Sequence, residues 1–136
     1  MRFRPSIVVV AAGRGSRFSA GAPEAPAKLE QPFGSSTVLG TTIRNAVQSQ
    51  LPVVVVTVAA LVPAASAHLA RRDIVGVGDD DAARGMGHSI ATGVAERSGA
   101  PGWLILPADM PLVQPGTLLA VASALEQHAV AYAQHK

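Results

Sequence analysis

The sequence predicts an α/β protein in which helices cover both faces of a mostly parallel sheet, giving three layers. Short apolar runs rich in β-branched residues alternate along the chain with segments of helical periodicity, the pattern of βαβ units. Some of these runs are apolar throughout, as expected of strands buried on both faces. The 136 residues suit a single domain spanning 1–136, and with 49% hydrophobic residues the chain can fill a core.

The expected strands are apolar runs bounded by glycine, proline or charged residues. The clearest is 53–58, a β-branched run that directly follows Pro52. We expect strands at 7–12, 53–58, 73–78 and 103–106, with a fifth at 129–133.

The expected helices carry apolar residues three and four positions apart. The spacing is regular in 36–50, where it is formed by Val38, Leu39, Thr42, Ile43, Ala46 and Val47. Segment 115–128 begins with proline, which is favoured in the first turn of a helix. We expect helices at 36–50, 88–97 and 115–128, and a short helix or turn at 63–71.

Composition excludes several classes of function. The chain has no cysteine, so it can form neither disulfides nor thiolate metal sites, which agrees with a reducing compartment. The net charge is +2 and no cluster of basic residues with interleaved aromatics occurs, which argues against nucleic-acid binding. The apolar run at 7–12 is too short for a signal peptide, and 51–67 is interrupted by two prolines. We therefore expect a cytoplasmic protein that does not bind membranes.

The first candidate site follows the first expected strand. The run I-V-V-V-A-A-G-R-G-S-R-F at 7–18 ends in a loop with two glycines and two arginines, and Lys28 follows. Glycine lets backbone N–H groups approach an anion closely, and basic side chains add charge, so the loop is suited to phosphate. The glycine spacing fits neither a P-loop nor a dinucleotide fingerprint. The alternative is an ordinary strand-to-loop turn with solvated arginines.

The second candidate site is L-P-A-D-M-P at 106–111, where Asp109 follows the fourth expected strand. Proline on either side fixes the backbone. In a parallel sheet Asp109 would share an edge with the glycine loop, and a carboxylate facing a phosphate loop is the kind of ligand that Mg²⁺ uses. The alternative is that Asp109 caps the following helix or completes an Asx turn.

The third candidate site is A-R-G-M-G-H-S-I-A-T-G at 83–93, preceded by three aspartates at 79–81. Its glycines lead into a helix that His88 or Ser89 would start, and a helix N-terminus offers free N–H groups to an anion or a nucleobase. The alternative is a glycine turn with Ser89 as N-cap. The aspartates are either solvated turn residues or acceptors for a base amino group or a ribose hydroxyl.

Together these three segments resemble the molybdenum-cofactor nucleotidyltransferase family. A-A-G-R-G-S-R-F with a following lysine resembles its opening signature, G-M-G-H-S-I-A-T-G-V the base-side segment of its cytidylyltransferase branch, and L-P-A-D-M-P-L-V its metal-binding segment. The resemblance implies a Rossmann-like, GT-A-like nucleotidyltransferase sheet. It also implies transfer of CMP from CTP to a phosphate-bearing acceptor such as molybdopterin or the molybdenum cofactor, with release of pyrophosphate.

The resemblance implies roles for particular residues. Arg17 and Lys28 would act catalytically on the triphosphate, and Asp109 would hold Mg²⁺. The expected nucleotide-binding residues are Ala11, Ala12, Gly13, Arg14, Gly15, Ser16, Arg17, Lys28, Asp80, Gly87, His88 and Ser89.

Two departures from the family pattern leave alternatives open. The stretch between Arg17 and Lys28 is longer than usual, and the family continues beyond the equivalent of Lys136. We therefore expect a C-terminally truncated, N-terminal nucleotide-binding portion, forming a homodimer through the uncovered edge at 129–133. The alternatives are a sugar-phosphate nucleotidyltransferase, against which 85–94 argues, and a nucleotide-binding remnant without catalysis.

Overall fold

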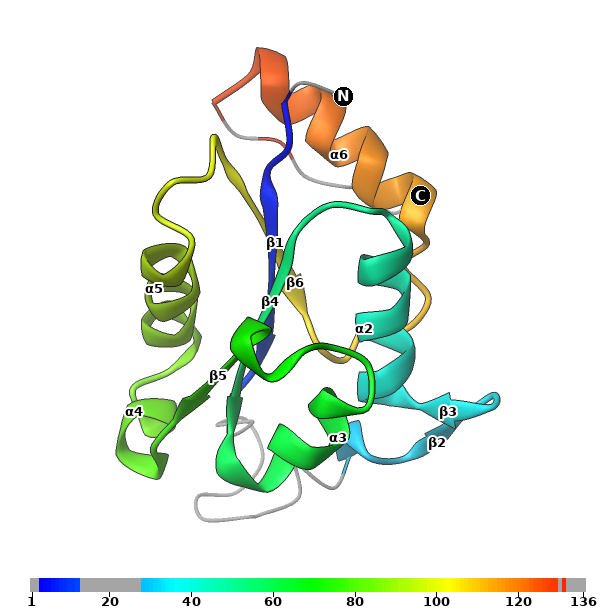
Figure 1. The fold of residues 1–136 in the computed structure, drawn as a ribbon, viewed down its shortest axis with the longest axis vertical. Coiled ribbons are helices and arrows are strands. Elements are labelled where there is room, and N and C mark those ends of the chain that lie inside the picture. Colours follow the sequence, from blue (N-terminus) through cyan, green and yellow to red (C-terminus); the bar gives the residue numbers. More distant parts are fainter. Residues whose placement is uncertain (1–2, 13–27, 130, 132–136) are drawn as a thin grey trace.

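Four parallel strands form the centre of the computed structural model, which describes residues 3–12, 28–129 and 131. The strands are β1 (Ser6–Ala11), β4 (Val53–Val58), β5 (Ile74–Val77) and β6 (Trp103–Pro107). They lie in the order β5-β4-β1-β6, and every pairing is parallel (Figure 1). The predicted parallel sheet is thus confirmed for the first four expected strands.

β1 is the most deeply buried strand, and all six of its residues are buried. Successive side chains point to opposite faces of a strand, so β1 contributes to two cores. Ile7 and Val9 belong to one apolar cluster, and Val8 and Val10 to the other. Burial on both faces explains why β1 and β4 are apolar at nearly every position.

Helices cover the two faces (Figure 1). On one face α2 (Val38–Gln48), α3 (Val62–Ser66) and α6 (Pro115–Gln127) pack over the cluster that contains Ile7. On the other, α4 (Asp79–Ala83) and α5 (Met86–Glu96) pack over the cluster that contains Val8. Two single 3₁₀ turns, Ala59–Leu61 and Arg71–Asp73, complete the connections. The three-layer α/β architecture is therefore confirmed.

α2 begins two residues later than its apolar spacing predicts. Ser36 and Thr37 form strand β3, which pairs with β2 (Pro32–Phe33) in a small antiparallel hairpin. Gly34 turns that hairpin with a φ of 59°, a conformation that glycine adopts without strain. The Thr37 hydroxyl then accepts a 2.9 Å hydrogen bond from the Gly40 N–H and so caps α2. A capping threonine must have extended backbone geometry, which excludes it from the helix.

The segment after β5 also differs from expectation. The aspartates at 79–81 begin the five-residue helix α4 rather than a turn. α5 starts at Met86, with Gly85 as its N-cap at a φ of 99°. Ser89 is therefore not the N-cap, and neither His88 nor Ser89 starts the helix. The positive φ at Gly85 allows the chain to turn directly from α4 into α5.

The expected last strand lies mostly outside the described residues, which include only Ala129 and Ala131 of it; neither is assigned to a strand. The strand and the dimer edge built on it remain predictions. Within the described part of the chain, no helix is both long and apolar enough to cross a membrane.

Gly93 allows α5 to lie close to the sheet, and this contact predicts a destabilising substitution. A Cβ at position 93 would collide with Val8 Cγ1 and lie 3.1 Å from Val56 Cγ2, and both valines are fully buried. We expect Gly93→Ala to lower the free energy of unfolding by about 1–3 kcal/mol, because overpacking outweighs the helix propensity of alanine. Thermal and urea denaturation measure the change.

Gly87→Ala is the matched control, because a Cβ at Gly87, in the same helix, meets nothing within 4 Å. It should be neutral or stabilising. Equal stability changes for the two variants would show that α5 can move away from the sheet freely.

Candidate active site

The strand order identifies a candidate ligand-binding position at one edge of the sheet. From β1 the chain proceeds to β4 and then β5 in one direction, and it returns to place β6 on the other side of β1. The crossover from β5 to β6 runs through α5, on the opposite face from α2 and α3 (Figure 1). The strand order of this sheet therefore reverses between β1 and β6. In open α/β sheets, ligands bind outside the carboxyl ends of the strands at such a reversal.

The carboxyl end of β1 is firmly held where the glycine loop begins. Ala11 and Ala12 are buried, with 2% and 1% of their surface exposed. The hydroxyl of fully buried Thr57, on β4, donates a 3.1 Å hydrogen bond to the Ala11 carbonyl. The other loop residues of the predicted site lie outside the described part of the chain: Gly13, Arg14, Gly15, Ser16 and Arg17. Their roles remain predictions.

Lys28 is exposed, and the residues around it are anchored to the core and to α2. Its neighbour Leu29 is buried in the main apolar cluster. The Gln31 N–H donates to the Lys28 carbonyl at 3.2 Å, and the Val38 N–H donates to the Gln31 carbonyl at 3.0 Å. The segment that carries Lys28 is thus hydrogen-bonded to the first residue of α2.

Asp109 lies next to the end of β1. The N–H of Ala108 donates a 3.0 Å hydrogen bond to the Val10 carbonyl, which extends the β1–β6 pairing to the residue before Asp109. Asp109 is exposed, and its carboxylate has no hydrogen bond or ion pair with any described residue. It does not cap the following helix, because the N-cap of α6 is Gln114. A carboxylate held by its backbone but without a side-chain partner is available to a ligand.

The amino-terminal end of α5 lies at the same edge, and α5 packs against β4 and β1 (Figure 1). No side chain caps this helix. The Ser89 side chain is completely buried, and its hydroxyl has no hydrogen-bond partner among the described residues. Gly87 is exposed. Uncapped N–H groups and an unsatisfied hydroxyl together leave hydrogen-bonding capacity at this end of α5.

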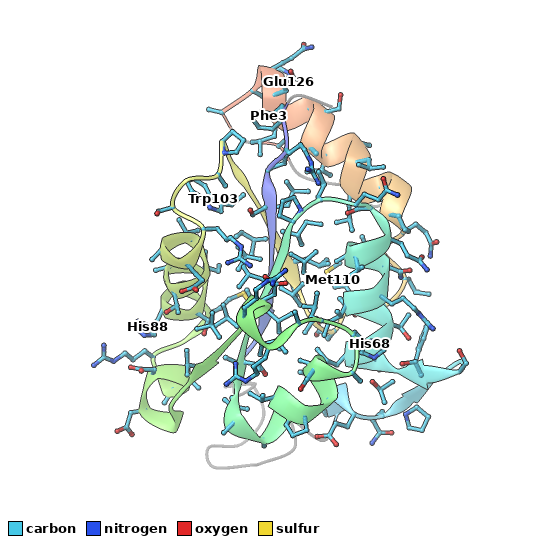
Figure 2. The ribbon with its side chains drawn as sticks, in the orientation of Figure 1. Phe3, His68, His88, Trp103, Met110 and Glu126 are labelled. Atoms are coloured by element: carbon cyan, nitrogen blue, oxygen red, sulfur yellow. The ribbon has the colours of Figure 1, made fainter. Side chains whose placement is uncertain are left out.

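His88 and Asp80 lie toward α4. His88 Nε2 is 3.5 Å from Asp81 Oδ1, and Figure 2 draws His88 at the end of α5 nearest α4. Arg84 Nε lies 4.0 Å from the same oxygen of Asp81. Asp80 is exposed.

β5 and β6 are the outermost described strands, and they are separated by three strand spacings of about 4.8 Å each. The structure therefore brings Asp109 to the end of β1 but places Asp80 and His88 on the β5 side.

An open hollow of about 430 Å³ lies at the opposite, amino-terminal edge of the sheet. Phe3, Trp103 and Glu126, labelled in Figure 2, contribute to its lining. Among the described residues that line it none is Lys or Arg, and the Glu126 carboxylate would repel phosphate. The hollow is therefore a poor candidate for the phosphate site that the glycine loop predicts.

Two polar residues make hydrogen bonds at the carboxyl edge of the sheet, and neither was predicted from the sequence. Thr57 is the polar member of the apolar run V-V-V-V-T-V, and Asn45 is half-buried beside the apolar face of α2. The Asn45 side-chain amide donates a 3.0 Å hydrogen bond to the Pro111 carbonyl. The sequence signals Thr57 by a polar residue at an otherwise apolar position, and it gives no such signal for Asn45.

Solved structures with the same arrangement include Rv0371c from Mycobacterium tuberculosis, with a TM-score of 0.70 and 29% identity over 92% of this chain. A structure of Rv0371c in complex with manganese matches with a TM-score of 0.68 and 26% identity, also over 92% of this chain. A nucleotidyl transferase, Mth528, from Methanothermobacter thermautotrophicus matches with a TM-score of 0.63 and 29% identity over 88%.

This chain spans 62%, 61% and 57% of the three solved chains, respectively. A comparison with curated proteins found no match. Among protein-family models, the MobA-like NTP transferase domain matches residues 7–136, from the second residue of β1 onward. The chain therefore belongs to the MobA-like NTP transferase domain family.

Proposed function

We propose that this chain is the nucleotide-binding portion of a nucleotidyltransferase that transfers CMP from CTP to a phosphate-bearing acceptor such as molybdopterin or the molybdenum cofactor. One observation carries the proposal: the Asp109 carboxylate, without a described partner, stands beside the end of β1 where the strand order reverses. A triphosphate on the glycine loop would lie next to this carboxylate.

The triphosphate would be bound by the loop that follows Ala12. Backbone N–H groups of residues 12–15, Arg17 and Lys28 supply donors and positive charge for its oxygens. The anchoring of Ala11 by Thr57 supports this assignment, because a rigid strand end fixes where the loop starts. The anchoring of Lys28 to α2 supports it in the same way.

Asp109 fits a divalent cation such as Mg²⁺. No group of three or more His, Cys, Asp or Glu side chains occurs among the residues that the structure describes, so these residues form no all-protein cage. Mg²⁺ is suited to such a place, because it binds through one or two carboxylates and completes its shell with water and phosphate oxygens. A bound cation would neutralise phosphate charge and polarise the phosphoryl group.

The base would lie on the β5 side of the edge. The uncapped N-terminus of α5, exposed Gly87 and exposed Asp80 would supply donors and acceptors there, whereas Ser89 could take part only if its buried hydroxyl became accessible. His88 contributes from the flank, where Asp81 holds its Nε2. The choice of cytosine rests on the resemblance of 85–94 to the cytidylyltransferase segment.

In the proposed reaction, a phosphate oxygen of the acceptor attacks the α-phosphorus of the nucleotide. A new P–O bond forms, the bond to the β-phosphate oxygen breaks, and pyrophosphate leaves. The chain need supply no nucleophile. Arg17 and Lys28 stabilise the charge on the triphosphate and on the leaving pyrophosphate, and the loop aligns the reacting groups.

A second candidate function is nucleotide binding without catalysis, which the same residues would also support. Calorimetric titration with CTP, GTP and ATP in the presence of Mg²⁺, followed by a pyrophosphate-release assay with molybdopterin, separates the two. Binding with turnover supports the transferase, and binding without turnover supports the second candidate.

We also propose that the chain forms a homodimer through residues 129–133, and light scattering tests this.

Asp109→Asn tests the metal role. The variant keeps the size of the side chain but removes its charge, so cation-dependent nucleotide binding should weaken at least tenfold, while the melting temperature stays nearly unchanged because Asp109 has no described partner. Titration of Mg²⁺ or Mn²⁺ with CTP present measures the effect.

Glu126→Gln, which removes an exposed carboxylate at the opposite edge of the sheet, serves as the control and should bind the cation normally. A collapse in melting temperature with normal cation affinity would show that Asp109 is structural.

Lys28→Ala tests the triphosphate contact. Hydrogen bonds to charged groups contribute about 1.5–3 kcal/mol, so the affinity for CTP should fall about ten- to hundredfold while the affinity for cytidine is unchanged. Arg72→Ala removes an exposed cation next to β5 as the control. Equal losses for CTP and cytidine would contradict a role at the phosphates.

A further inference from the structure

Asn45 links α2 to the segment that carries Asp109. Its Nδ2 donates a 3.0 Å hydrogen bond to the Pro111 carbonyl, 66 residues away in the sequence. Met110, the residue before Pro111, is drawn beside α2 (Figure 2). The segment after β6 therefore passes along α2 and is bonded to it through one side chain.

Asparagine is an unfavourable choice for this place by local criteria. Asn45 lies inside the eleven-residue α2, next to Ala46 and three residues after Thr42, both of which are fully buried. Asparagine in a helix interior competes with the backbone for hydrogen bonds, and an apolar residue would suit a half-buried position better. A reason for the amide must therefore come from its distant partner.

The bond completes a pair of tethers on either side of Asp109. Before Asp109, the Ala108 N–H is bonded to the Val10 carbonyl at 3.0 Å. After it, the Pro111 carbonyl is bonded to Asn45 at 3.0 Å. Only Asp109 and Met110 lie between the tethered residues, and the proline ring fixes φ at position 111. The backbone of Asp109 is thus held between β1 and α2.

α2 is also tied to the segment that carries Lys28. The Val38 N–H, at the first residue of α2, is bonded to the Gln31 carbonyl, and the Gln31 N–H to the Lys28 carbonyl. One helix is therefore connected through backbone and side-chain hydrogen bonds to the segments that carry Lys28 and Asp109.

We propose that Asn45 is a positioning residue, which sets the place of the Asp109 carboxylate relative to the triphosphate site through the Pro111 carbonyl. The inference rests on the proposed function of Asp109 as a cation ligand. Asn45 itself touches no substrate: its amide fixes the segment, and the segment orients the carboxylate.

The test compares Asn45→Leu with Thr42→Val in the full chain. Leucine fills a similar volume without a donor. Thr42→Val removes a buried hydrogen bond on the same helix, from the Thr42 hydroxyl to the Val38 carbonyl, that does not reach the Asp109 segment. The Mn²⁺ affinity is measured by electron paramagnetic resonance with CTP present, well below the melting temperature, and cytidine binding is measured separately.

We expect Asn45→Leu to weaken Mn²⁺ binding about two- to tenfold, the effect of one hydrogen bond, and to leave cytidine binding unchanged. Thr42→Val should lower the melting temperature without altering Mn²⁺ affinity. Asn45→Asp, which keeps the shape but points a carboxylate at the carbonyl, should act as Asn45→Leu does. In the Asp109→Asn background, Asn45→Leu should have no further effect on Mn²⁺ affinity.

The outcomes separate the two proposals. If Asp109→Asn leaves Mn²⁺ affinity unchanged, the cation role of Asp109 is wrong. If Asp109→Asn weakens Mn²⁺ binding but both Asn45 variants bind Mn²⁺ normally, the positioning role is wrong. It is also wrong if Thr42→Val weakens Mn²⁺ binding as much as Asn45→Leu, or if the effects of Asn45→Leu and Asp109→Asn are additive.

Discussion

The burial of β1 is the constraint on which the rest of the structure depends. β1 is paired on both edges and covered on both faces, and all six of its residues are buried. A strand in that position must be mostly apolar, as β1 is after Ser6, and its polar backbone groups must be satisfied by parallel neighbours. Polar side chains that face solvent can therefore occur beyond the carboxyl end of β1, which ends at Ala11, and this places the candidate site at the edge of the sheet.

The same constraint explains why function and stability can be separated here. Asp109 and Lys28 are exposed, whereas the residues that hold their backbones in place are buried or half-buried: Ala108, Leu29 and Asn45. The proposed binding groups therefore stand on a rigid frame without contributing much to the core. This division suits a site that must bind and release a highly charged ligand, because the charged side chains change partners while the frame stays fixed.

Much of this fold can be predicted from the sequence, because burial leaves a periodic signal. The β-branched runs of β1 and β4 and the apolar spacing of α2 identify strands and helix, and alternation implies the parallel sheet. Helix starts were harder to predict, because caps and turns decide them. Thr37 is extended by its capping role, and Gly85 enters α5 with a positive φ, but neither conformation leaves a periodic pattern in the sequence.

The candidate site shows a similar division. The position of Asp109 could be predicted, because it comes two residues after a strand and the carboxyl ends of parallel strands meet at one edge of the sheet. The roles of Thr57 and Asn45 could not, because each depends on a partner distant in sequence: the Ala11 carbonyl for Thr57 and the Pro111 carbonyl for Asn45. Such a partner is visible only after the chain has folded. A polar side chain within an apolar run is costly unless it is paired, so Thr57 already indicates that an acceptor must exist, although the sequence does not identify it.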